Sequence, residues 1–208
     1  MRNNILLALF IFTFFACNKD NSNETSNNPT TDCSILPYRI GTVMMNRFKS
    51  NNRDTFITQS FSLDTTVNAK RYVGTRSNSL YDKGAYFRID EKGDIYLLNT
   101  DPSQNGSQDI ELLVVKNNAP VGTTWTWGST SSGIKHDFKI ISTSETFILN
   151  GKTYINGIAI EDTWGNYLHP TINTKTYFCG IGFASAQFKQ NLNGSWNTET
   201  MNLMFYQY

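Results

Sequence analysis

Few residues of this chain could carry catalytic or metal-binding chemistry. It has only two histidines, His136 and His169, which are far apart in the sequence. They cannot form the closely spaced pair or the His-Glu-x-x-His helix that zinc enzymes use. Asp137, Ser131 and Ser132 lie near His136, but there is no Gly-x-Ser-x-Gly elbow, and proximity in sequence does not build a catalytic triad. We therefore expect no metal, no cofactor and no catalytic residue.

Acidic and aromatic residues come closest together around Trp164, where Glu161 and Asp162 precede it and Tyr167 follows. Aromatic faces stack on sugars, carboxylates accept hydrogen bonds from sugar hydroxyls, and a facing pair of carboxylates can hydrolyse a glycosidic bond. An acidic pair beside a turn more often consists of solvent-exposed residues with no role in binding or catalysis. We interpret Trp164 and Tyr167 as candidate ligand-lining residues.

Trp125 and Trp127 alternate with threonines, so that both indoles would lie on one face of a strand. Large aromatic side chains of this kind usually pack in a core. The alternative is that the two indoles line a ligand site, and both tryptophans are kept as candidates for that role.

The N-terminus has the layout of a secretory signal, with Arg2, a short apolar run, a small residue and then Cys17. The run is too short to span a bilayer as a helix. Phe14-Phe15-Ala16-Cys17 resembles the bacterial lipobox, which implies cleavage of residues 1–16 and lipidation of Cys17 with palmitate-like chains. Two or three acyl chains anchor a protein permanently. The alternative is an ordinary signal peptide that happens to end at a cysteine.

Residues 17–32 are rich in Asn, Ser and Thr and lack large apolar residues after the cysteine, a composition typical of a flexible tether. Asn18-Lys19-Asp20 resembles the export signal of surface lipoproteins in the Bacteroidota. The resemblance implies a lipid-anchored protein of the outer membrane, facing the cell exterior, with the periplasmic face as the alternative.

The charge and the cysteine content further limit the class of protein to which the chain can belong. Removal of residues 1–16 takes away only Arg2, so 18 − 1 = 17 basic residues face 17 acidic ones in the mature chain. Such balance without a basic cluster argues against nucleic acid as a partner. In an oxidising compartment Cys33 and Cys179 could form a disulfide, and the alternative is two buried free cysteines.

The elements that must position these residues are strands. Asn-Gly pairs such as Asn150-Gly151 favour tight hairpins. The β-branched and aromatic runs between them, such as 55–58 and 135–141, are typical of strands. Alternation places Tyr177, Cys179, Ile181 and Phe183 on one face of a strand. Residues 33–208 should form one all-β domain, an antiparallel meander of roughly ten to twelve strands, curved into a half-barrel or barrel, with a β-sandwich as the alternative.

Four segments, residues 36–41, 88–96, 120–125 and 177–182, resemble a loose group of Bacteroidota lipoproteins, although Met44 replaces the tryptophan usual in that group. The resemblance implies a curved sheet related to the lipoprotein-carrier (LolA-like) half-barrels. It implies no catalytic residues.

Taken together, these features predict a non-enzymatic outer-membrane or surface lipoprotein. It either binds an apolar or glycan ligand or is a structural part of the cell envelope. The alternatives are a protein-interaction module without a small ligand and a carbohydrate-active enzyme.

Overall fold

The computed structural model describes residues 39–50, 53–78, 85–98, 111–129, 134–166, 169–192 and 194–207. Within these residues, the chain forms one antiparallel sheet of twelve strands and has no helix long and apolar enough to cross a membrane. The strands are β1 (Val43–Ser50), β2 (Arg53–Val67), β3 (Lys70–Ser77), β4 (Tyr86–Ile89), β5 (Ile95–Leu98), β6 (Glu111–Val115), β7 (Thr124–Ser129), β8 (Ile134–Leu149), β9 (Lys152–Asn166), β10 (His169–Phe178), β11 (Gly182–Leu192) and β12 (Ser195–Gln207). The predicted all-β meander is confirmed.

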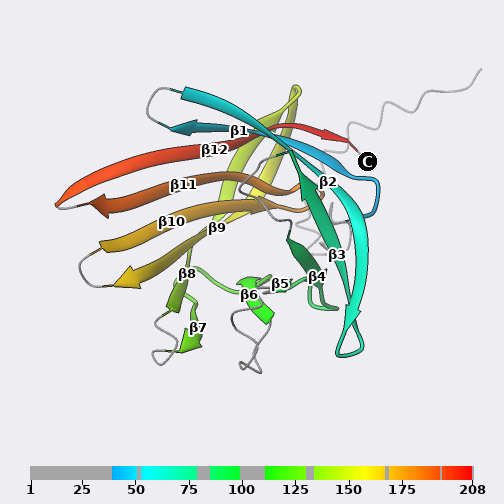
Figure 1. Ribbon diagram of the computed structural model, residues 1–208, viewed down its shortest axis with the longest axis horizontal. Coiled ribbons are helices and arrows are strands. Elements are labelled where there is room, and N and C mark those ends of the chain that lie inside the picture. The colour runs from blue at the N-terminus through cyan, green and yellow to red at the C-terminus, as the bar shows by residue number, and fades with distance from the viewer. Residues whose placement is uncertain are drawn as a thin grey trace, which may run out of the picture.

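The strand order is β6-β5-β4-β3-β2-β1-β12-β11-β10-β9-β8-β7, so the chain makes two meanders that are joined where β1 pairs with β12. That pairing places Val43 opposite Gln207 and Lys49 opposite Thr200. The sheet curls until its two end strands, β6 and β7, approach each other (Figure 1). The result is a nearly closed barrel, and the β-sandwich alternative is wrong.

The hairpin between β8 and β9 shows why the sequence folds this way locally. Its turn residues, Asn150 and Gly151, have φ angles of 52° and 77°. Both positions of a type I′ turn require positive φ, which asparagine and glycine adopt more readily than other residues. The hairpin predicted at Asn150-Gly151 is therefore confirmed.

An apolar core fills the middle of the barrel, with side chains from both meanders. Its most buried members include Met44, Phe61, Ile95, Val115, Phe138, Ile140, Ile160, Phe178, Ile181 and Leu203. Gly157 on β9 allows the closest approach, because a Cβ atom there would lie 2.4 Å from ring atoms of Phe178. The ring of Phe178 thus packs directly over the backbone of β9.

One predicted alternation is wrong. Tyr177 and Phe178 end β10, the chain then turns, and Phe183 belongs to β11, so residues 177–183 do not form one strand. The register also shifts between Thr176 and Tyr177. Gly180 and Gly182 have φ angles of 84° and 66°, which favour a turn. Alternation alone cannot reveal a bulge followed by a tight turn, because Ile181 in the turn is buried like a strand residue.

The barrel closes through side chains where β6 meets β7. The Trp125 indole Nε1 donates a hydrogen bond to the Leu113 carbonyl oxygen at 2.9 Å, and the Trp127 indole Nε1 donates to the Glu111 carbonyl oxygen at 2.8 Å. Trp125 and Trp127, two residues apart on β7, thus bind the backbone of two residues that are also two apart on β6. The two indoles take the place of a backbone ladder across this gap.

Glu111 anchors the same junction through its side chain. Its carboxylate accepts hydrogen bonds from Arg88 Nε at 2.7 Å, from the Tyr72 hydroxyl at 2.6 Å and from Lys70 Nζ. Burial opposes ionisation of Glu111, but these three donors prevail and lower its pKa to about 2. Burial and the neighbouring carboxylate raise the pKa of Tyr72 to about 12. The cluster connects β3 and β4 to the edge strand β6.

Candidate functional site

Register aligns inward-facing residues into rows across the four strands β9 to β12. Each member of a row lies directly opposite the next on the neighbouring strand. The row nearer the strand ends contains Trp164, Thr171, Gln190 and Asn197, and the next row contains Asp162, Asn173, Phe188 and Glu199. Because side chains alternate along a strand, the two rows share one face of the sheet. Polar groups thus replace the apolar core toward this end of the barrel.

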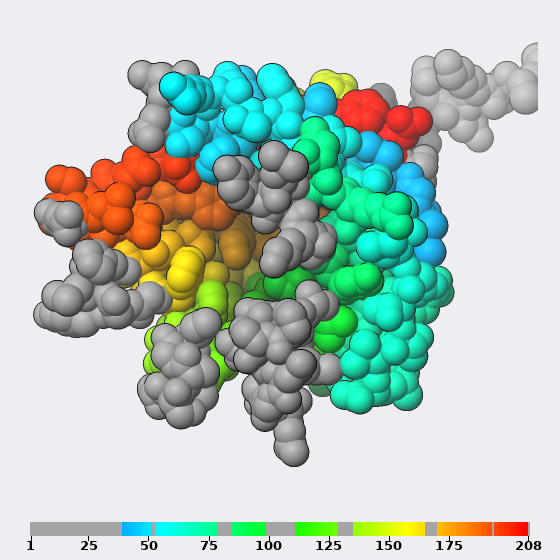
Figure 2. All heavy atoms as spheres, viewed as in Figure 1, coloured from blue at the N-terminus to red at the C-terminus, as the bar shows by residue number. Residues whose placement is uncertain are grey.

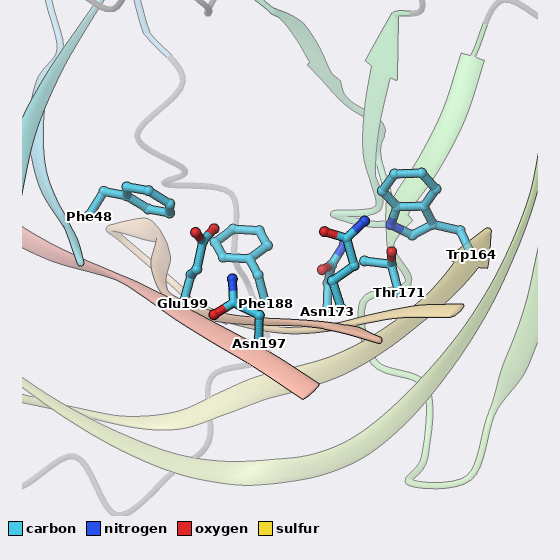
Figure 3. A pocket seen from close by; sticks show the side chains of 8 residues that line it. Phe48, Trp164, Thr171, Asn173, Phe188, Asn197 and Glu199 are labelled. Atoms are coloured by element: carbon cyan, nitrogen blue, oxygen red, sulfur yellow. The ribbon is translucent and has the colours of Figure 1, made fainter. Parts of the chain in front are cut away.

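These rows line a pocket of about 410 Å³, a size that suits a small-molecule ligand. Seven of the eight residues in the two rows contribute to it, all except Asp162, and Phe48 of β1 completes the lining. Figure 3 shows the pocket with two ends: Phe48, Phe188, Asn197 and Glu199 lie at one, and Trp164, Thr171 and Asn173 at the other. The space-filling view shows a hollow over the strands of this half of the barrel (Figure 2).

Asn173 lies in the wall of the pocket and is only 6% exposed. Its side-chain Oδ1 atom is buried and has no hydrogen-bond partner. Leaving a buried acceptor unsatisfied costs about 1–3 kcal/mol. Buried polar groups in proteins are almost always paired, so this acceptor in the pocket wall is one that a water molecule or a ligand hydroxyl could satisfy.

Trp164 is 39% exposed and provides an aromatic surface at the edge of the pocket. Its ring stacks on His136, with 5.6 Å between ring centroids. His136 is held in turn by Asp162, since its Nδ1 lies 2.8 Å from the Asp162 Oδ1. Lys175 Nζ lies 3.4 Å from the second oxygen of this buried carboxylate. The contact with Asp162 therefore fixes the His136 ring, on which the indole of Trp164 stacks.

Glu199 is the one charged residue among the eight that line the pocket in the described part of the chain. Ser50 Oγ donates a hydrogen bond to Glu199 Oε1. Phe188 lies directly opposite Glu199 in the register of β11 and β12. The rings of Phe48 and Phe188 meet edge to face, with 6.3 Å between centroids. This end of the pocket combines a carboxylate with two aromatic rings.

Comparison with known proteins yields no family model that matches the chain and no curated protein that matches it. Among solved structures, it is similar to a candidate lipoprotein from Parabacteroides distasonis, with 9% identity and a TM-score of 0.46 over 83% of this chain and 98% of that one. It is also similar to a candidate exported protein with a YmcC-like fold from Bacteroides fragilis, with 10% identity and a TM-score of 0.46 over 84% and 99% of the two chains.

Three of the four aromatic residues predicted to line a ligand site are among the described residues, and the ring of His136 lies between two of them, Trp127 and Trp164. Trp164 lines the pocket, whereas Trp125 and Trp127 pack against the core and bind the backbone of β6. Tyr167 lies outside the described residues. The structure thus places one of these candidates in the pocket wall and two at the closure of the barrel.

The predicted cysteine roles fall largely outside the described residues, which include neither Cys17 nor Cys33. Cys179 is disulfide-bonded. Its pairing with Cys33 stays a prediction, and so does the lipidation of Cys17.

The histidine pairs with a different carboxylate from the one next to it in sequence. Asp137 binds Lys135 and Thr126, while His136 points to the opposite face of β8 and contacts Asp162. Among the described residues, no group of three or more His, Cys, Asp or Glu side chains is placed to hold a metal ion.

Sequence reasoning missed most of the pocket. Four of the five polar residues in its lining come in pairs with one residue between them, Thr171 with Asn173 on β10 and Asn197 with Glu199 on β12. Polar residues at strand positions that should face the core are the sequence feature that could have indicated a binding site here. That signal becomes readable only when the register of four strands is known, because only then do the pairs fall side by side.

Proposed function

We propose that this protein is a non-enzymatic, lipid-anchored protein of the bacterial cell envelope that binds a small carbohydrate in the pocket at the end of its barrel. The observation that carries the proposal is the buried, unpartnered Oδ1 of Asn173 in the pocket wall. A ligand hydroxyl would donate to this atom and remove the cost of leaving it unsatisfied.

The remaining lining suits a sugar better than an apolar ligand. Thr171, Gln190 and Asn197 offer hydroxyl and amide groups, which can both donate to and accept from sugar hydroxyls. The indole of Trp164 offers a flat apolar surface for the C–H face of a sugar ring. An apolar ligand would cover these polar groups without pairing them, which costs free energy.

Binding without hydrolysis is supported by the placement of the acidic residues. The two carboxylates of a glycosidase flank the scissile bond about 5–9 Å apart. Glu199 is the only carboxylate in the described lining of the pocket, and Asp162 is already engaged by His136 and Lys175. Glu161 neighbours Asp162 on β9 and therefore faces the opposite side of the sheet.

The cell-envelope part of the proposal rests on the lipobox-like segment that ends at Cys17. Lipidation there, followed by export to the outer face of the outer membrane, would place the pocket where glycans are available. The tether would keep the barrel close to the membrane surface.

The test is titration calorimetry of the mature protein with a panel of oligosaccharides. We expect saturable binding to at least one of them and a loss of about tenfold or more in affinity for Trp164→Ala. The matched control is Trp196→Ala, which removes an exposed tryptophan that alternation places on the outer face of β12. The proposal is overturned if no saccharide binds, or if the two variants bind equally well.

A further inference from the structure

We propose that the Glu199 end of the pocket recognises a positively charged amino group, so that the carbohydrate is an amino sugar with a free amine. This inference rests on the proposed function and specifies the substrate class of the same site. It follows from the charge, the aromatic rings and the division of the pocket into two chemically different ends.

Among the described residues, no lysine or arginine forms an ion pair with Glu199 or lines the pocket. The Ser50 hydroxyl donates one hydrogen bond to Oε1 but carries no charge, so no described residue compensates the charge of the carboxylate. An ammonium group would supply the missing positive charge through a charge-assisted hydrogen bond, which is about twice as strong as a neutral one.

Phe188 is the direct cross-strand neighbour of Glu199, and Phe48 contacts Phe188 from β1. Figure 3 shows both rings beside the carboxylate. An amino group placed here would meet a carboxylate and aromatic surfaces together, the combination that attracts cations through both charge and cation–π interaction.

The other end of the pocket is lined by the uncharged residues Trp164, Thr171 and Asn173. Asn173, with its unpartnered acceptor, lies near Trp164 and away from Glu199 (Figure 3). It offers an independent contact for a hydroxyl, while Trp164 supports a sugar ring. A ligand that spans the pocket therefore needs an amine at one end and a hydroxylated ring at the other. Acidic sugars are disfavoured, because their carboxylates would lie near Glu199.

The experiment compares two ligands of the same length and linkage, the glucosamine trimer and the fully N-acetylated trimer. Calorimetry is carried out at about pH 6, where an amine with a pKa near 8 is charged. We expect the glucosamine trimer to bind about tenfold more tightly than the acetylated trimer. This preference should shrink as salt is added, because salt screens charges that solvent reaches.

Two variants assign the preference to a residue. Glu199→Gln keeps the shape of the side chain and an acceptor for Ser50, so it should reduce the preference to less than about twofold and leave the acetylated trimer within about threefold of wild type. Glu161→Gln removes one negative charge from the outer face of β9 and should keep the full preference.

The outcomes separate the two proposals. Equal binding of both trimers to the wild-type protein overturns the amine inference and leaves carbohydrate binding in place, as does a preference that survives in Glu199→Gln. If neither trimer binds, the amine inference fails. If the rest of the oligosaccharide panel also shows no binding, the proposed function fails with it.

Discussion

Replacement of Glu111 by glutamine should destabilise the barrel at the junction of its two edge strands. Glutamine has nearly the same shape and retains an acceptor for the Tyr72 hydroxyl, so the substitution mainly removes charge. Arg88 then loses its counterion in a place where its side chain is only 14% exposed. A partly buried guanidinium without a partner carries a desolvation cost that the carboxylate otherwise offsets.

The magnitude follows from the pKa of the carboxyl group. The fold lowers it from 4.5 to about 2. Each pH unit between the folded and unfolded pKa corresponds to about 1.4 kcal/mol, which gives an upper limit of about 3–4 kcal/mol. Lys70 is 47% exposed, and solvent screens its share of the interaction. We therefore expect Glu111→Gln to lower the free energy of unfolding by about 2 kcal/mol near neutral pH.

The sign of the pH dependence gives a sharper test. Because the folded pKa of Glu111 is lowered, its contribution is fully present above about pH 4.5 and is lost as the pH falls toward 2. Urea unfolding, followed by tryptophan fluorescence, should therefore show a large difference between wild type and variant at about pH 7 and a much smaller one at about pH 2.5.

The matched control is Asp64→Asn, which also removes a carboxylate that binds an arginine. Asp64 and Arg71 have side chains that are 40% and 68% exposed, so the control should shift the unfolding midpoint only slightly. The reasoning is refuted if both variants shift it equally, or if the difference between wild type and Glu111→Gln does not change with pH.

Two further predictions concern the core and the anchor. Gly157→Ala should lower the free energy of unfolding by about 1–3 kcal/mol, because the added methyl group would lie 2.4 Å from ring atoms of Phe178; an unchanged urea midpoint would contradict the packing described. Cys17→Ser should abolish metabolic labelling of the protein with a fatty-acid probe, and labelling that persists would rule out lipidation at this residue.

Much of the fold is predictable from local chemistry. The Asn150-Gly151 turn needs only residues that tolerate positive φ, and the β-branched and aromatic runs beside it have the composition of strands. The shift between Thr176 and Tyr177 was not predictable, because a bulge depends on the partner strand. Closure of the barrel also depends on an interaction between distant residues, Trp127 with the Glu111 carbonyl.

The candidate site was less predictable than the fold. Trp164 could be singled out because aromatic and acidic residues cluster around it in the sequence. Glu199 and Asn173 carry no such local signal, since each is one polar residue within a polar strand segment. Their importance arises from the register of β10, β11 and β12, which places them on either side of Phe188.

Because β1 pairs with β12, the domain could be circularly permuted. Val43 and Gln207 lie opposite each other, so a short linker could join the ends of this domain. New ends could be opened between β6 and β7, which share no backbone ladder. In such a circular permutant, every strand would pair only with strands adjacent to it in sequence. The pairing with the longest sequence separation would become a local hairpin, and the lower contact order should make the permuted barrel fold faster than the natural one.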